Sequence, residues 1–139
     1  MALLLVRHAG AGSRQAWEGD DRERPLDPRG VNQARNLVAL LKPFEVEAIY
    51  TSPYRRCRET VEPLAAARLI GIESREELGE AEQHDAGAEL VRSLAGRNAV
   101  VCGHGGLEAA VLESPPKWRK GDVLVIDAEL RVVDVLRRP

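Results

Sequence analysis

The chain has 139 residues, 44% of them apolar and 30% charged, and its formal net charge is -2 at pH 7. This length and composition are typical of one compact domain, predicted here over residues 1–139, and they exclude an intrinsically disordered chain. The small net charge gives no indication of broad electrostatic attraction to nucleic acid or anionic lipid, so neither is expected as a partner.

The cysteines and the first residues indicate a reducing compartment. Cys57 and Cys102 lie far apart and outside any C-x-x-C pair, which argues against a disulfide framework or a structural zinc site. The apolar run at residues 2–6 is much too short for a secretory signal core or a membrane span. We therefore predict a cytoplasmic protein without a membrane partner.

Three segments have the character of central strands. Residues 2–6 form a continuous aliphatic run without polar alternation, which is typical of a strand covered on both faces in a parallel sheet. Residues 48–51 and 98–102 have the same character. The sequence thus predicts a buried parallel sheet.

A helix is predicted between the first two strands. Asp27 can cap it, and Pro28 suits its first position. Its apolar face includes Val31 and Leu37, which are spaced as on one side of a helix. Pro43 should end it, because proline cannot continue the hydrogen-bonding pattern.

The middle of the chain predicts further alternation of helix and strand. Ser52 can cap a helix that begins at Pro53, and Pro63 should kink or restart this helix. Residues 69–72 have the character of another short strand. Helical spacing returns at residues 90–94.

The last third of the chain predicts one more helix and a hairpin. Residues 107–111 have helical spacing, and residues 123–126 and 130–136 are apolar segments with only residues 127–129 between them. Such a gap permits an antiparallel hairpin but no crossover. Together, the elements predict an α/β domain, a three-layer α/β/α sandwich whose mostly parallel sheet has an antiparallel C-terminal edge hairpin.

Reactive and cationic side chains follow three of the predicted strands. Arg7 and His8 follow the first, Arg56 comes shortly after the second, and His104 lies in a glycine-rich turn after the fourth. Ligands of open α/β sheets bind beyond the carboxyl ends of the strands. We therefore expect two imidazoles and at least two guanidinium groups to converge on one crevice.

These residue types are typical of an anion site that contains a nucleophile. Guanidinium groups match phosphoryl oxygens bidentately, and glycines let the backbone approach a ligand closely. A neutral imidazole is a competent nucleophile near pH 7, and neighbouring cations disfavour its protonation. We expect such a site to need neither a metal ion nor a cofactor.

Three motifs resemble those of the histidine phosphatase (phosphoglycerate mutase-like) superfamily. They are Leu-Val-Arg-His-Ala at residues 5–9, Ser-Pro-Tyr-Arg-Arg-Cys-Arg-Glu-Thr at residues 52–60 and Cys-Gly-His-Gly-Gly at residues 102–106. Residues 26–34 also fit, so the resemblance covers nearly the whole chain. The sequence most resembles the short SixA-type branch and is also similar to the phosphatase domain appended to some MutT-type Nudix hydrolases.

The resemblance implies a role for each of five residues. It implies His8 as the nucleophile, Arg7 and Arg56 as phosphate ligands, and His104 as a second imidazole that binds the phosphoryl group in the transition state. Glu80 lies in a Leu-x-Glu segment, which larger members of the family use as the source of their proton donor.

Some assignments stay open at this point. Glu82 and Asp85 are rivals of Glu80 for the role of proton donor, whereas His84 is expected at the surface. The charged segments at residues 20–24 and 117–120 are compatible with solvated loops and equally with loops that border the site.

The expected function is a metal-independent phosphatase that acts through a phosphohistidine intermediate on His8. Its partner would be a phosphorylated small molecule or a phosphohistidine protein, and the sequence does not choose between them. One alternative is a mutase-like phosphotransferase, although the chain has few residues from which to build the lid that shields a phosphoenzyme from water. The other alternative is a non-catalytic phosphate- or phosphoprotein-binding module.

Overall fold

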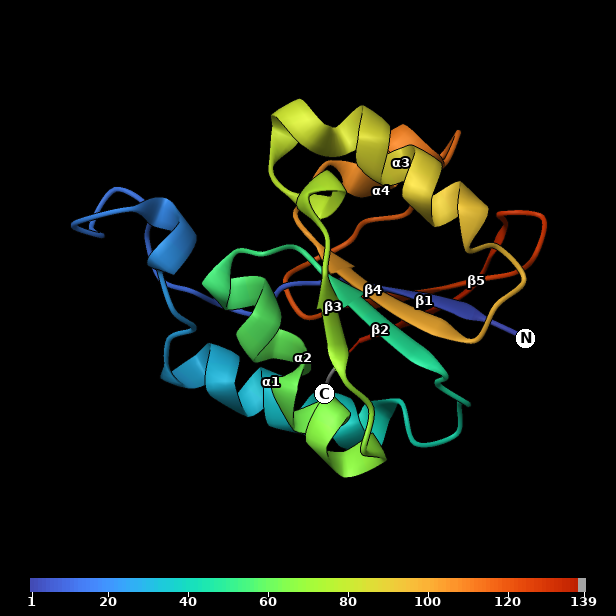
Figure 1. Ribbon diagram of the computed structural model, residues 1–139, viewed down its shortest axis with the longest axis horizontal. Helices are drawn as coiled ribbons and strands as arrows, with labels where there is room; N and C mark the ends of the chain where they lie inside the picture. Colours follow the sequence, from blue (N-terminus) through green and yellow to red (C-terminus); the bar gives the residue numbers. More distant parts are fainter. Residues whose placement is uncertain (138–139) are drawn as a thin grey trace.

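A six-stranded sheet crosses the middle of the molecule (Figure 1). The computed structural model describes residues 1–137, so the last two residues of the predicted domain over 1–139 lie outside the described part. The strands, in chain order, are β1 (Leu3–Arg7), β2 (Ala48–Thr51), β3 (Ile72–Ser74), β4 (Ala99–Gly103), β5 (Val123–Ile126) and β6 (Val132–Leu136).

The strand order in space is β3-β2-β4-β1-β5-β6. Strands β3, β2, β4 and β1 pair in parallel, whereas β5 runs antiparallel to β1, and β6 runs antiparallel to β5. This order places β1 and β4 side by side in the centre, with Arg7 opposite Gly103 at their carboxyl ends. The residues that follow these two strands therefore meet at one edge of the sheet.

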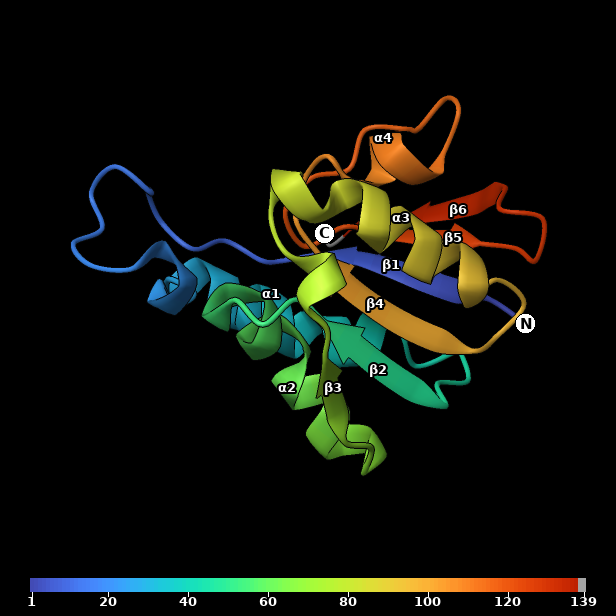
Figure 2. The same ribbon diagram turned by 45° about the horizontal axis from the view of Figure 1, so that its top comes forward.

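Helices cover both faces of the sheet (Figures 1 and 2). Helices α1 (Pro28–Leu40) and α2 (Arg55–Arg68) lie on one face, and α3 (His84–Ser93) and α4 (Leu107–Val111) lie on the other. Short 3-10 helices occur at Asp21–Glu23, Glu76–Leu78 and Ala81–Gln83. The predicted three-layer α/β/α sandwich with a mostly parallel sheet and an antiparallel C-terminal hairpin is confirmed.

The aliphatic run of β1 is continuous because both of its faces are buried. Leu4 and Val6 pack in the core under α1 and α2, whereas Leu3 and Leu5 pack in the core under α3 and α4. All four side chains are fully buried. Burial of a leucine-sized side chain stabilises the fold by about 1.5–3 kcal/mol, so the strand is anchored from both sides.

The start of α1 follows the prediction. The Asp27 carboxylate accepts a hydrogen bond from the backbone N–H of Gly30 at 2.7 Å, and Pro28 occupies the first helical position. Leu37 is buried, but Val31 is 38% exposed, so its assignment to the inner face was wrong. The helix ends at Leu40, before Pro43.

Two predictions in the middle of the chain need correction. Helix α2 begins at Arg55 rather than at Pro53, and no side chain caps it. It continues through Pro63 to Arg68 without restarting. The predicted strand over residues 69–72 is displaced to β3 (Ile72–Ser74), because Leu69 takes a left-handed conformation (φ 56°) that ends α2.

Along residues 1–137, none of the helices combines the length and the apolar character that a membrane crossing requires.

Candidate active site

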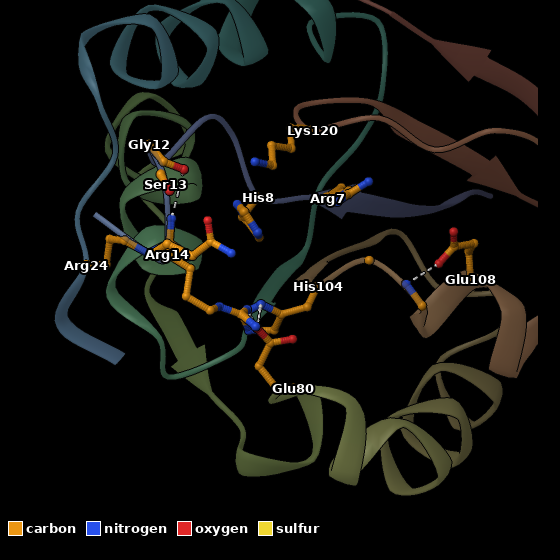
Figure 3. Close-up of a pocket in the computed structure, with 13 residues that line it drawn as sticks. Arg7, His8, Gly12, Ser13, Arg14, Arg24, Glu80, His104, Glu108 and Lys120 are labelled. Carbon is orange, nitrogen blue, oxygen red and sulfur yellow. Dashed lines mark hydrogen bonds and ion pairs between the residues drawn. The ribbon is translucent and has the colours of Figure 1, made fainter. Parts of the chain in front are cut away.

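A pocket of about 610 Å³ opens at the carboxyl ends of β1 and β4 (Figure 3). Its walls include Arg7, His8, Glu80, the turn that carries His104, and the loop at residues 12–15. The central strands bring two of the predicted motifs to this edge, and the β1–α1 loop closes one side. The expected convergence of His8, Arg7 and His104 is therefore present.

His8 is held as a neutral imidazole. Its Nδ1 lies 2.7 Å from the backbone oxygen of Ala9. Because a carbonyl oxygen can only accept, Nδ1 carries the ring hydrogen, and Nε2 keeps its lone pair. Burial lowers the pKa of His8 from 6.5 to about 3, and the charges of His104, Arg56 and Arg7 act in the same direction, whereas the bond to Ala9 opposes them.

His104 lies across the pocket from His8. The two ring centroids are 5.4 Å apart, and the rings meet edge to face. Its Nε2 is 2.8 Å from the Ser52 hydroxyl oxygen, which itself accepts from the backbone N–H of Tyr54. With Nε2 engaged by the Ser52 hydroxyl, Nδ1 is the ring nitrogen left to bind a ligand. That buried nitrogen has no hydrogen-bond partner within residues 1–137.

Ser52 thus acts differently from the prediction. It was expected to cap α2, but its side chain instead orients His104. The free thiol of Cys57 lies 3.6 Å from the same ring nitrogen, and both cysteines are fully buried. The second motif therefore contributes positioning groups for His104 as well as its arginine.

The Arg7 side chain is fixed from two sides. Its Nη1 donates to the backbone oxygen of Trp118 at 2.8 Å, while its Nε is buried and has no partner within residues 1–137. The guanidinium group also lies directly against Gly105. The segment at residues 117–120 therefore borders the site, since Trp118 holds Arg7 and Lys120 lines the pocket.

Arg56, rather than Arg55, is buried beside the site, where it contacts Glu80 but does not itself line the pocket. Arg56 is 1% exposed, and its Nη2 lies 2.8 Å from the Glu80 carboxylate and 3.1 Å from the Asp21 carboxylate. Its Nη1 donates to the Asp21 backbone oxygen at 2.9 Å. Arg55 lies at the surface, where it pairs with Glu59 at 3.0 Å.

Glu80 lies at the edge of the pocket between three cationic or imidazole groups. Its Oε2 pairs with Arg56 and with Arg14, and it lies 3.7 Å from Nδ1 of His104. Of the two rivals for the role of proton donor, Glu82 and Asp85 are both exposed and do not line the pocket. Geometry therefore favours Glu80 among the three carboxylates.

Asp21 and Arg24 place the segment at residues 20–24 at the border of the site, and Arg14 is a residue of the site that sequence reasoning missed. Asp21 binds Arg56 and also Arg24, which is 6% exposed, and Arg14 reaches Glu80 from the β1–α1 loop. Partial burial raises the pKa of Asp21, but Arg24, Arg56 and Arg14 outweigh it and hold that pKa below its ordinary value. The alternation of acidic and basic residues at residues 20–24 is the sequence signal for these ion pairs.

His84 was expected at the surface, but it is half-buried and packs on the turn that carries His104. Its Nε2 lies 3.3 Å from the backbone oxygen of Gly105. The turn itself bends sharply at Gly106, where φ is +108° and a β-carbon would lie 2.7 Å from the His84 ring. A side chain at position 106 is therefore excluded both by backbone strain and by contact.

Comparison with known proteins points to one family. The family model of the histidine phosphatase superfamily (branch 1) matches residues 3–86. An 8-oxo-(d)GTP phosphatase of Mycolicibacterium smegmatis is 40% identical over 116 residues, which are 80% of this chain and 36% of that protein. The chain thus spans well under half the length of this curated relative.

Solved structures share the fold. The protein histidine phosphatase SixA, solved with tungstate, superimposes with a TM-score of 0.80 at 20% identity, covering 98% of this chain and 96% of that one. A SixA structure from Agrobacterium tumefaciens gives a TM-score of 0.82 at 23% identity, covering 99% and 98%. With the family model matched over most of the chain, and with His8 and His104 facing one another beside Arg7, the chain belongs to the histidine phosphatase superfamily.

Proposed function

We propose that residues 1–139 form one phosphatase domain that hydrolyses a phosphomonoester or a protein phosphohistidine through a covalent phosphohistidine on His8. The observation that carries this proposal is the buried His8 ring, whose Nδ1 is bound to Ala9 and whose pKa is lowered to about 3. A ring in this state presents the lone pair of Nε2 at every physiological pH. Membership of the histidine phosphatase superfamily supports the same reading.

In the first step, His8 Nε2 forms a bond to phosphorus while the bond from phosphorus to the leaving group breaks. Negative charge on the phosphoryl oxygens is stabilised by Arg7 and Arg56, because guanidinium groups match these oxygens in pairs. In the proposed mechanism, Nδ1 of His104 donates a further hydrogen bond. Since these groups already neutralise the transferring charge, the proposed reaction requires no metal ion.

Glu80 is the proposed donor of a proton to the leaving group. Its carboxylate shares the Arg56 guanidinium at 2.8 Å, so phosphoryl oxygens that bind Arg56 compete with it. In the proposed mechanism, the displaced carboxyl group gives its proton to the leaving group. In the second step, water attacks phosphorus and gives a proton to the Glu80 carboxylate, the bond from phosphorus to His8 breaks, and inorganic phosphate leaves.

Each of the two proposed substrate classes is suggested by a different relative. SixA is a protein histidine phosphatase, whereas the relative of 40% identity is an 8-oxo-(d)GTP phosphatase. We therefore include phosphohistidine proteins, nucleotides and simple monoesters in one panel of substrates. The pocket alone, at about 610 Å³, is of ordinary size for a small-molecule site.

The test combines turnover with a covalent trap. Purified protein, treated exhaustively with chelator, is incubated with each member of the panel, and inorganic phosphate is measured. We expect phosphate release and, after rapid denaturation, phosphate on His8. Transfer of the phosphoryl group to an acceptor without release of phosphate would indicate the mutase alternative. Binding without either product would indicate a phosphate-binding module.

A further inference from the structure

A second hollow adjoins the catalytic pocket. It has a volume of about 420 Å³ and shares Arg7, Gly12 and Lys120 with the first pocket. The remaining wall comes from the start of α1, at Asp27 and Arg29, and from Gln33 and Arg119. We call it the side pocket.

Positive charge dominates the side pocket, although the whole chain carries a net charge of -2. Arg29, Arg119 and Lys120 all line it, and within residues 1–137 none of the three forms a salt bridge. The single carboxylate in the wall, Asp27, is already engaged by the backbone N–H groups of Gly30 and Gly12. Three cations without a salt-bridge partner in the described part of the chain thus line a hollow whose wall holds one carboxylate.

Gln33 adds a donor of fixed orientation to the same wall. Its side chain is 7% exposed, and its Oε1 accepts a hydrogen bond from the backbone N–H of Gly10 at 2.9 Å. This bond fixes the orientation of the amide group, so its nitrogen Nε2 points away from Gly10. Within residues 1–137, that nitrogen makes no hydrogen bond. A fixed donor beside three cations is suited to an oxyanion.

We propose that the side pocket binds a second phosphate group of the substrate. The inference rests on the proposed phosphatase function and narrows the substrate to small molecules with two separate phosphate groups. One phosphate reacts at His8, and the other is held by Arg29, Arg119 and Gln33. The two hollows share Arg7, Gly12 and Lys120 in their walls, so the proposed substrate extends from one into the other.

Phosphate suits the side pocket better than a carboxylate does. A carboxylate offers two oxygens in one plane, whereas a terminal phosphate offers three oxygens, which point in different directions. Here the donors come from three separate segments: the first turn of α1, its middle, and the loop that precedes β5. Donors on several sides are arranged for a group with tetrahedral geometry and up to two negative charges.

The test compares two substrates that differ by one phosphate, glucose 6-phosphate and glucose 1,6-bisphosphate. The variant is Arg29→Ala combined with Arg119→Ala, because both side chains line the side pocket alone. We expect kcat/KM for the bisphosphate to fall about tenfold, the equivalent of one charge-assisted hydrogen bond. Turnover of the monophosphate should change less than about twofold.

Arg97→Ala is the matched control. Arg97 is exposed and lies two residues before β4, at the amino end of the strand, so it lies at the sheet edge opposite the pocket. The Arg97→Ala variant should have the same kcat/KM as the wild type for both substrates. Equal loss on both substrates in the double variant, or no loss on either, would overturn the side-pocket proposal.

A binding measurement separates this proposal from the proposed function. The double substitution is introduced into His8→Ala, and the dissociation constants of both compounds are measured by calorimetry. An increase of about tenfold in the dissociation constant of the bisphosphate alone supports the subsite. This holds even if the wild-type chain turns over neither compound, and only the phosphatase proposal then fails. An unchanged dissociation constant for the bisphosphate overturns the subsite.

Discussion

The Arg7 guanidinium lies so close to Gly105 that a β-carbon at position 105 would be 2.9 Å from its Cζ atom. The opposite side of the group is held by the Trp118 carbonyl, at 2.8 Å from Nη1. Arg7 therefore occupies a slot with no room for a larger residue at position 105. The glycine of the third motif thus fixes the arginine of the first.

Replacing Gly105 by alanine should displace the Arg7 guanidinium and lower kcat/KM by about 10²-fold, because misplacement of a positioning group by about 1 Å has effects of this size. Gly71→Ala is the control, since a β-carbon there would meet nothing within 4 Å. Steady-state kinetics on an aryl phosphate compare the two. Equal activity of both variants would contradict the proposed role of this slot.

Replacing His8 by alanine should abolish turnover while the protein stays folded. The ring faces the pocket, so its removal leaves the two hydrophobic clusters of the core untouched. In the wild type, rapid denaturation during turnover should trap phosphate on His8 as an acid-labile, alkali-stable adduct. Mass spectrometry identifies the residue, and phosphate found on a serine or a cysteine would refute the mechanism.

The lowered pKa of His8 predicts how the stability of the folded chain depends on pH. Its folded-state pKa of about 3 lies below the ordinary 6.5, so between these pH values the unfolded chain binds a proton that the folded chain does not. The free energy of unfolding therefore falls as the pH drops from 6.5 towards 3. Urea unfolding at pH 7.5 and pH 4.5 should show a smaller acid-induced loss in His8→Ala than in the wild type, by on the order of 1 kcal/mol or more.

Arg56→Lys should impair catalysis much more than Arg55→Lys. The buried Arg56 guanidinium uses both terminal nitrogens, one on the Asp21 carbonyl and one on carboxylates, and a lysine cannot reproduce this fork. We expect a loss of about 10²-fold or more in kcat for Arg56→Lys. Arg55 is exposed and pairs only with half-buried Glu59, so its variant should lose less than about twofold. The reverse ranking would move the phosphate ligand to position 55.

Glu80→Gln should slow the hydrolysis of alkyl phosphates by about 10²-fold while it leaves activated aryl phosphates nearly unaffected. A good leaving group departs without a proton, so only the poor one depends on the acid. Glu82→Gln and Asp85→Asn serve as controls, because both residues are exposed and lie outside the pocket wall. Equal loss on both ester classes in all three variants would exclude each of them as the donor.

Several elements of this structure were readable from short stretches of sequence. The aliphatic runs predicted β1, β2 and β4, and the Asp27 cap predicted the start of α1, because strand burial and helix capping depend on residues close together in the chain. Two predictions failed, one through a contact between distant residues and one through the local backbone. Ser52 was free to bond His104 rather than a helix end, and Leu69 took a left-handed conformation that shifted β3.

The sequence by itself determined that His8, Arg7 and His104 meet at one sheet edge, since each follows a parallel strand and such strands end together. Only the tertiary structure decided what holds them there. Arg7 is fixed by Trp118, 111 residues away, and Arg56 by Asp21, 35 residues away. Such contacts depend on how loops pack across the finished sheet, and no periodicity of two or 3.6 residues encodes them. The side pocket likewise exists only because α1 and the loop before β5 fold against the same strand end.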